Sequence, residues 1–236
     1  MACICNQTEI ARYLVQGAKV DVECDDNCGN TPLLHAINSG LSLNLDLVRI
    51  LLEAGADPNH FNRHGHSALF TVVRRASEHS LDGILAVEEL IEHGCNLNDN
   101  DSGEPVIHLT ISRGQDRITE ALVRSGADVN VRNQRGFSPL HRVAREEKVE
   151  LVSLLIAAGA DVHLPKKFYT DEAGQVRDIK NPEIRKIFAQ HSMKIPSLKH
   201  LSRLAMRQWL ERRADSVIKQ LPFPLSLKRY LLLLDL

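Results

Sequence analysis

The chain has 236 residues, of which 43% are hydrophobic and 25% charged, and its 29 Lys and Arg residues nearly balance 30 Asp and Glu residues. This composition is typical of a soluble domain with a small appendage, and the absence of any apolar run of 18 residues argues against a transmembrane helix. Aromatic residues make up only 4% of the chain. The core must therefore consist of Leu, Ile, Val and Ala, which favours packed helices over a sandwich or barrel.

The N-terminal residues show no features of an exported protein. They read MACICNQTEI and contain neither a basic leader nor a following apolar stretch of the secretory type. We therefore expect a protein of the cytoplasm or nucleus whose five cysteines are reduced thiols. Four cysteines precede residue 29, but their C-x-C and C-x3-C spacings are looser than the paired C-x2-C ligands of zinc sites. We predict no metal and no cofactor.

A seven-residue motif built around a glycine recurs along the chain. Its copies are QGAKVDV, AGADPNH, HGCNLND, SGADVNV and AGADVHL, with glycines at Gly17, Gly55, Gly94, Gly126 and Gly159. Such a period indicates a repeat architecture. Apolar residues spaced three and four apart predict a helix before each of the last four glycines, which then serve as C-caps. The predicted helices are Leu47–Glu53, Ala86–Glu92, Ile118–Arg124 and Leu151–Ala157.

A second motif follows each of the first four copies and predicts another helix. It reads GNTPLLHAI from Gly29, GHSALFTVV from Gly65, GEPVIHLTI from Gly103 and GFSPLHRVA from Gly136. A hydroxyl side chain there suits a helix N-cap, and Pro suits the first helical turn. The segment Thr8–Gly17 supplies only the second helix of such a pair. Residues 39–44 and 77–83 are predicted insertions between the two helices of a pair.

These motifs resemble the ankyrin repeat. The family pattern G-x-T-P-L-H-x-A is best kept by Gly136, Ser138, Pro139, Leu140, His141 and, one place late, Ala144. The resemblance implies an all-α solenoid of helix pairs with β-hairpin fingers, in which His108 and His141 are structural. The expected domains are an N-terminal half-repeat at 1–28 and repeats at 29–192, which start near 29, 65, 103 and 136 and end in a degenerate cap at 168–192. Within this cap, residues 183–189 are predicted to form a helix.

Ankyrin repeats leave their finger tips and first helices exposed, and this surface binds other proteins. The resemblance therefore implies a face that recognises a protein substrate. Its candidate residues are Phe61, Arg63, His64, Arg74, Arg75, Asp99, Asp101, Arg113, Arg132 and Arg135. His64 and His66 could suggest a metal site, but polar residues are routine at a hairpin, and we interpret both as finger residues.

The composition changes after Met193. Residues 194–236 contain nine basic and three acidic residues, whereas the preceding residues contain 20 basic and 27 acidic ones. This contrast indicates a second module. Leu198, Leu201, Ala205 and Trp209 recur at helical spacing, LPFP breaks the chain at 221–224, and an apolar run follows. So small a leucine-rich segment cannot build an adequate core alone and needs a partner.

This tail resembles a SOCS box, which implies a three-helix module at 193–236. Ser197, Leu198 and Met206 match the family's elongin-binding motif, with Ser202 where Cys is usual, and the L-P-x-P motif of cullin binding is present. The resemblance implies that the first helix binds elongin C, itself bound to elongin B, and that the second segment binds cullin-5 with its RING partner. The implied elongin-binding residues are Leu198, Leu201, Ser202, Ala205 and Met206, and the implied cullin-binding residues are Leu221, Pro222, Phe223, Pro224, Leu227, Tyr230 and Leu231.

Together the two modules resemble the ankyrin repeat and SOCS box family, which implies a substrate-recognition subunit of a ubiquitin ligase. The chain contains no nucleophile motif, phosphate-binding loop or dinucleotide fingerprint, so we expect no enzyme. One alternative is an ankyrin scaffold or inhibitor whose box is weakened by Ser202, since a buried hydroxyl without a partner costs about 1–3 kcal/mol. Nucleic-acid binding by the basic tail is disfavoured because no reader motif accompanies the charges.

Overall fold

The computed structural model describes residues 3, 7–18, 20–38, 43–77, 80–101, 104–162 and 181–192. The chain divides into two compact units, residues 1–121 and residues 122–236, which are taken separately below. Every prediction for the tail at 193–236 lies outside the described residues, as do the start of the degenerate repeat at 168–180 and most of the insertion at 39–44.

The first unit is built from short helices and one small hairpin. In chain order these are α1 (Thr8–Arg12), the π-helical turn η1 (Tyr13–Gly17), α2 (Pro32–Asn38), α3 (Leu45–Glu53), α4 (Ala68–Arg75), α5 (Leu81–Glu92), β1 (Asn100–Asp101), β2 (Glu104–Pro105), α6 (Val106–Ser112) and the first part of α7 (Asp116–Arg124). β1 pairs antiparallel with β2, with Asn100 opposite Pro105 and Asp101 opposite Glu104. These are the only strands among the described residues.

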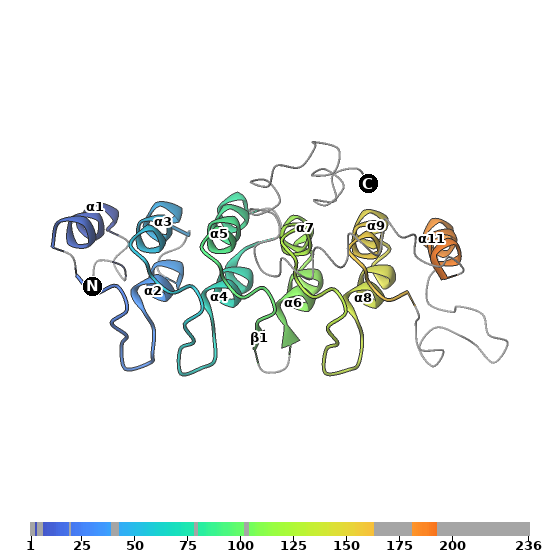
Figure 1. Cartoon of the computed structure of the whole chain (residues 1–236), viewed down its shortest axis with the longest axis horizontal. Coiled ribbons are helices and arrows are strands. Elements are labelled where there is room, and N and C mark those ends of the chain that lie inside the picture. The colour runs from blue at the N-terminus through green and yellow to red at the C-terminus, as the bar shows by residue number, and fades with distance from the viewer. Residues whose placement is uncertain are drawn as a thin grey trace, which may run out of the picture. The chain divides into compact units, whose positions relative to one another are not determined.

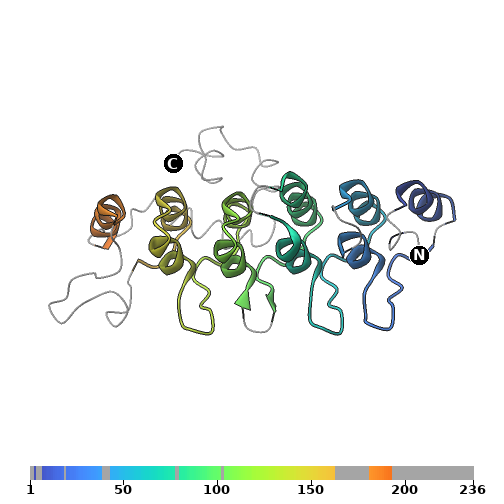
Figure 2. The same cartoon turned by 180° about the vertical axis from the view of Figure 1, so that it is seen from behind.

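The helices of the first unit form two rows (Figure 1). Helices α1, α3 and α5 pack side by side in one row, and α2, α4 and α6 pack in the other. The rows are joined because α2 packs on α3 and α4 packs on α5. Each hairpin finger extends beyond the row of α2, α4 and α6, and the view from behind shows the same arrangement (Figure 2). This is the helix-pair architecture predicted from the repeat.

The core lies between the two rows and is aliphatic. Leu47 and Leu51 of α3, one helical turn apart, are 0% and 1% exposed, and Leu33, Leu69 and Leu90 are equally buried. Burial of one such side chain contributes about 1.5–3 kcal/mol. The short helices are therefore held by packing, since isolated helices of this length are marginal in water.

Local sequence fixes where the helices begin and end. The side chains of Ser67 and Ser80 accept hydrogen bonds from the backbone of Phe70 and Gly83, both at 3.1 Å, and so cap α4 and α5. All four predicted glycine C-caps are confirmed by positive φ values, which reach +100° at Gly126. The prediction that residues 77–83 lie between helices needs correction, because α5 begins at Leu81.

The second unit contains the end of α7 and the helices α8 (Pro139–Arg145), α9 (Val149–Ala157) and α11 (Pro182–Ser192). α9 packs against both α8 and α11. Ser138 begins α8 with a capping box: its side chain accepts from His141 N–H, and His141 Nδ1 accepts from Ser138 N–H at 3.2 Å. The helix predicted at 183–189 is confirmed within α11. Across the described ranges, no helix has both the length and the apolar character needed to cross a membrane.

Candidate protein-binding site

The fingers are stiffened by the same turn in both units. In each of three fingers, one side-chain oxygen accepts hydrogen bonds from the backbone N–H groups two and four residues later, at 2.7–3.0 Å. The accepting residues are Asp26, Asn62 and Asn133. Asn and Asp side chains favour such turns because they can replace a backbone acceptor. The turn geometry therefore depends on these three positions and not on the residues at the tips.

A second device, which we call the finger clamp, ties one finger to the next at two places, once in each unit. Asn59 donates through Nδ2 to the carbonyl of Gly94 at 3.2 Å and accepts through Oδ1 from Asn96 N–H at 2.6 Å. In the second unit Asn130 makes the same pair of bonds, to Gly159 O at 3.1 Å and from Asp161 N–H at 2.7 Å. Each clamp satisfies a donor and an acceptor of the neighbouring backbone, so it sets the spacing between fingers.

The first clamp of the chain is different in its chemistry. Glu23 Oε1 accepts from Asp57 N–H at 2.8 Å, although Asp21 occupies the place of Asn59 in the motif. Asp21 instead accepts from Glu23 N–H at 2.9 Å. A carboxylate has no donor, so this clamp makes one bond to the neighbouring finger where an Asn makes two.

The first two fingers also approach each other closely. Arg63 N–H donates to the carbonyl of Cys28 at 2.9 Å, and Asn62 Nδ2 donates to Asn30 Oδ1 at 2.9 Å. Gly29 lies at this contact with a φ of +74°, and a Cβ on it would lie 3.0 Å from Arg63 N. Only glycine combines that backbone conformation with so close an approach. The two fingers therefore form one continuous surface.

Seven of the ten predicted substrate-face residues are exposed. Phe61 is 48% exposed and is the aromatic member of this set. The other exposed members are Arg63, His64, Arg74, Arg113, Arg132 and Arg135. Arg132 Nη1 donates to Gly136 O at 3.0 Å within its own finger. The exposed set thus combines one aromatic side chain with several basic ones, a composition that is enriched in protein-binding surfaces.

Three of the predicted residues, Arg75, Asp99 and Arg113, make hydrogen bonds to neighbouring elements. Arg75 Nη1 donates to Ile37 O at 2.6 Å, and Arg113 Nη2 lies 3.5 Å from Ala76 O, so each arginine serves the C-terminal carbonyls of the preceding first helix. Asp99 is only 3% exposed and accepts a hydrogen bond from the Ser67 hydroxyl. The backbone of Asp101 belongs to β1, and its side chain lies outside the described residues.

The two histidines that were predicted to be structural are buried. His108 and His141 are 0% and 1% exposed, and His141 closes the capping box of α8. Gln115, which no sequence motif marked, is 1% exposed and donates through Nε2 to Val73 O at 2.9 Å and Ala76 O at 2.6 Å. The sequence could not mark Gln115 as structural, because its partners are carbonyls at the end of α4, and the position of that end was not known from the sequence.

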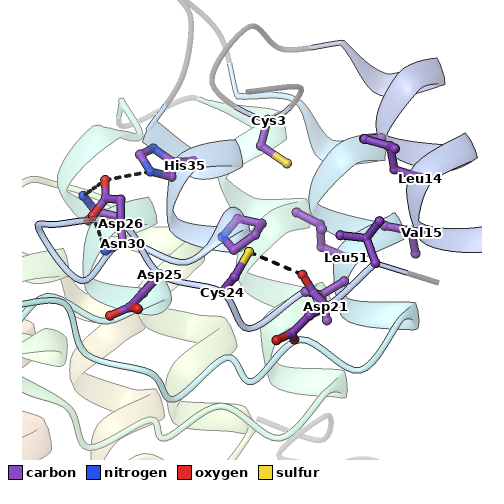
Figure 3. A pocket seen from close by; sticks show the side chains of 14 residues that line it. Cys3, Leu14, Val15, Asp21, Cys24, Asp25, Asp26, Asn30, His35 and Leu51 are labelled. Atoms are coloured by element: carbon purple, nitrogen blue, oxygen red, sulfur yellow. Dashed lines mark hydrogen bonds and ion pairs between the residues drawn. The ribbon is translucent and has the colours of Figure 1, made fainter. Parts of the chain in front are cut away.

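A cavity of about 290 Å³ lies beside the first finger (Figure 3). Leu14 and Val15 come from η1, Leu51 comes from α3, and His35 comes from α2. The rest of its lining is Cys3, Ala11, Val20, Asp21, Val22, Cys24, Asp25, Asp26, Asn30 and Pro32. The walls are thus mainly aliphatic, and apart from Cys3 and His35 the polar groups belong to the finger.

Three aspartates, Asp21, Asp25 and Asp26, make the lining of the cavity acidic. Hydrogen bonding from Asn30 N–H, aided by the Asn30 side chain, Cys28 N–H and nearby His35, lowers the pKa of Asp26 to about 2. His35 Nε2 lies 2.9 Å from Asp26 Oδ2. Burial raises the pKa of the Cys3 thiol, so Cys3 is a neutral thiol at neutral pH. In the described portion of the chain, no group of three or more His, Cys, Asp and Glu side chains is arranged to hold a metal ion.

Comparison with known proteins agrees with these features. The model of ankyrin repeats (3 copies) matches residues 1–62 and 75–166, and the SOCS box model matches residues 194–232. Curated relatives include an ankyrin repeat protein of Acanthamoeba polyphaga mimivirus, 32% identical over 50% of this chain and 11% of its own length, and the B-cell lymphoma 3 protein homolog of Mus musculus, 29% identical over 61% of this chain and 31% of its own. The chain spans less than a third of the length of these relatives.

A solved structure shows the same fold. An ankyrin repeat domain from Acinetobacter baumannii AYE is 30% identical, with a TM-score of 0.56 over 66% of this chain and 78% of that one. The repeated helix pairs, their capping glycines and the two family matches lead to one assignment. The chain belongs to the ankyrin-repeat proteins and carries a SOCS box at residues 194–232.

Proposed function

We propose that this protein is the substrate-recognition subunit of a ubiquitin ligase that contains elongin B, elongin C, cullin-5 and a RING partner. The observation that carries the proposal is the presence of ankyrin repeats and a SOCS box in one chain. Both are adaptor-type modules. The repeats would bind a protein substrate for ubiquitination and proteasomal degradation, and the partner subunits would transfer the ubiquitin.

The geometry of the fingers supports a binding role. Phe61, Arg63 and His64 are exposed on a backbone that is held by the Asn62 turn and by the bonds to Cys28 and Asn30. A surface that is ordered before it meets its partner loses little conformational entropy on binding. Phe and Arg are also among the residue types that are enriched in protein interfaces.

For the SOCS box, the sequence supports a helix-in-groove mode of binding. In this mode Leu198 would be the central apolar anchor on elongin C, with Leu201, Ala205 and Met206 on the same stripe. Pro222 and Pro224 would fix the segment that selects cullin-5. The compartment that fits this assembly is the cytoplasm or the nucleus.

The test is co-purification of the full chain with elongin B, elongin C and cullin-5. The wild type should retain all three, and Leu198→Ala combined with Pro222→Ala should lose them, while helicity and melting of the repeats stay unchanged. A matched control is Leu81→Ala combined with Pro182→Ala, because both residues are exposed on the repeats. This control should retain all three partners.

Two outcomes would contradict the proposal. Failure of the wild type to retain any of the three proteins would favour an ankyrin scaffold or inhibitor with a weakened box, the alternative that Ser202 suggests. A melting transition that drops as far as binding does would show that the tail belongs to the fold. The variant Ser202→Cys should strengthen elongin binding by about tenfold, since an unpaired buried hydroxyl costs roughly 1–3 kcal/mol.

A further inference from the structure

Three serines of the chain follow an arginine by three residues. They are Ser77, Ser138 and Ser216, and of these only Ser77 has arginines both three and two residues before it, at Arg74 and Arg75. Basic side chains at these two places are the charge pattern that arginine-directed serine/threonine kinases select, because carboxylates beside the kinase active site pair with the guanidinium groups. The sequence therefore offers three candidate modification sites, of which the site at Ser77 fits the pattern best.

The two described candidates differ in burial. Ser77 is exposed directly after the end of α4, where the backbone leaves the helix at Ala76 with a ψ of 136°. Ser138 is only 3% exposed, and its side chain caps α8. A kinase has to bring the serine hydroxyl within bonding reach of the γ-phosphate of ATP, so it can use Ser77 in the folded chain but not Ser138. Ser216 lies outside the described residues.

The two arginines belong to the last turn of α4. Arg74 is exposed, whereas Arg75 is half-buried and donates through Nη1 to Ile37 O at 2.6 Å. A kinase that takes both guanidinium groups must open this turn and break that bond. Terminal turns open at a much lower free energy than the core of a fold. The kinase therefore needs a local opening of one turn and not unfolding of the repeat.

Arg113, which follows α6, is placed to hold a phosphate on Ser77. Helices α4 and α6 pack side by side in one row (Figure 1), and Arg113 Nη2 lies 3.5 Å from the carbonyl oxygen of Ala76, the residue before Ser77. The same carbonyl accepts from Gln115 Nε2 at 2.6 Å, which fixes the chain just before the serine. Arg113 is itself exposed. A guanidinium group forms strong charge-assisted hydrogen bonds with phosphate oxygens, so Arg113 is a suitable partner for the modified side chain.

The start of α5 also favours a negative charge at this place. Ser77 O accepts from Ser80 N–H at 3.1 Å, and Ser80 is the N-cap of α5. The helix dipole stabilises an anion close to a helix N-terminus. Glu78, Asp82 and Asp116 are acidic residues in the segments that flank the site, and they oppose the phosphate. The contribution of Arg113 therefore has to be measured directly.

We propose that Ser77 is a phosphorylation site for an arginine-directed serine/threonine kinase and that Arg113 holds the resulting phosphate. The kinase transfers the γ-phosphoryl group of MgATP. A bond forms between Ser77 Oγ and the γ-phosphorus, the bond from this phosphorus to the bridging oxygen breaks, and ADP leaves. The hydroxyl proton passes to the carboxylate base of the kinase.

The modification changes the charge of the predicted substrate face. Arg74, Arg75 and Arg113 belong to that face, and a phosphate on Ser77 adds a charge of about −1.5 to −2 among them. Phosphorylation then weakens binding of an acidic substrate and favours a basic one. This consequence rests on the proposed function, whereas the modification itself does not.

The experiment incubates the full chain with MgATP and the catalytic subunit of cyclic-AMP-dependent protein kinase, which is an arginine-directed enzyme, and locates the phosphate by mass spectrometry. Ser77 should be modified and Ser138 should not. Arg74→Gln should slow modification of Ser77 by about tenfold, as expected for the loss of one charge-assisted hydrogen bond. Arg12→Gln, a change of an exposed arginine on α1, is the matched control and should leave the rate unchanged. An unmodified Ser77, equal rates at Ser77 and Ser138, or equal rates in the two variants would overturn the inference.

A second measurement tests the contact with Arg113. Phosphorus NMR follows the second ionisation of the phosphate, whose pKa is about 6 in phosphoserine. In the phosphorylated wild type the midpoint should lie about half a pH unit below that of phosphorylated Arg113→Gln, the size expected for an exposed ion pair. Phosphorylated Arg12→Gln should titrate like the wild type. Equal midpoints in the wild type and Arg113→Gln would overturn the role of Arg113.

The inference and the proposed function fail separately. Leu198→Ala combined with Pro222→Ala should be phosphorylated on Ser77 as fast as the wild type, because the site uses only residues of the repeats. A chain that retains elongin and cullin but is not modified on Ser77 would contradict the inference alone. A chain that is modified on Ser77 but retains neither partner would contradict the ligase proposal alone.

Discussion

Replacing Gln115 by Met tests whether the link between α7 and the end of α4 stabilises the fold. The side chain is buried, and its Nε2 donates to Val73 O and Ala76 O at 2.9 and 2.6 Å. Met has a similar length but no donor, so both bonds are lost with little change in packing. Each bond contributes about 1 kcal/mol, and a carbonyl left without a partner costs roughly 1–3 kcal/mol more.

The carbonyls are not affected equally. Arg113 Nη2 remains 3.5 Å from Ala76 O, whereas Val73 O loses the side-chain donor of Gln115. Gln115 Oε1 is buried without a hydrogen-bond partner among the described residues, so its removal returns part of the cost. We expect a net loss of about 2–3 kcal/mol from the free energy of unfolding, on the scale of net hydrogen-bond and desolvation energies. For a chain of this size the melting temperature should fall by about 5–10 °C.

The measurement is urea unfolding and thermal melting followed by circular dichroism. The matched control is Gln190→Met, because Gln190 is exposed on α11 and should change the midpoint little. A Gln115→Met midpoint equal to that of the control would refute the reasoning.

The variant Gln115→Glu extends the test. Its carboxylate would face two carbonyls, so the pKa of the carboxyl should be higher in the folded protein than in the unfolded chain. This variant should therefore be most stable below about pH 4 and lose stability as the pH rises.

Three further predictions concern the fingers and the surface. Asn59→Ala removes both bonds of a finger clamp and should cost about 1–2 kcal/mol in urea unfolding, and no change relative to the exposed control Asn38→Ala would contradict the role of the clamp. Because the folded pKa of Asp26 is lowered to about 2, its carboxylate should stabilise the fold above pH 4, and this contribution should disappear as the pH falls towards 2. An NMR titration of Asp26 with a midpoint near pH 4 would oppose this. Arg49 and Glu89 form an exposed ion pair between α3 and α5, so Arg49→Gln should shift the midpoint only slightly, and not at all in high salt.

The second helices of the repeats could be predicted because their information is local. In α3, Leu47 and Leu51 lie one turn apart on a single face, and Gly55 follows at the C-cap with a positive φ. Apolar spacing and the conformational freedom of glycine act within a few residues, so no knowledge of the neighbouring repeat is needed.

The start of α5 and the role of several polar side chains could not be predicted. Gly83 lies in the first turn of α5 and in sequence resembles part of a loop, but Ser80 accepts its N–H and begins the helix earlier. Arg75 and Asp99 were expected on the exposed face, yet each is used by a neighbouring element. Such partners lie more than 30 residues away, and the sequence pattern alone does not show which tip residues will reach them.

The cavity is the clearest example of what only coordinates reveal. The sequence shows that Thr8–Gly17 supplies one helix of a pair, which is a statement about connectivity. That Val15, Leu51 and His35 then line a common space follows from packing between elements that are distant in the chain. Hydrophobic periodicity identifies a buried face but not what lies against it.

The finger clamps make the tips interchangeable. The clamps and turns use Asn59, Asn62 and the backbone, and within the described ranges the side chains of Phe61, Arg63 and His64 make no hydrogen bond that sets the spacing of the fingers. Substitutions at these tips can therefore change which protein is recognised without altering the scaffold that presents them. The chain separates its stable parts from its variable parts along each hairpin, and a protein engineer could retarget it by exchanging tip side chains alone.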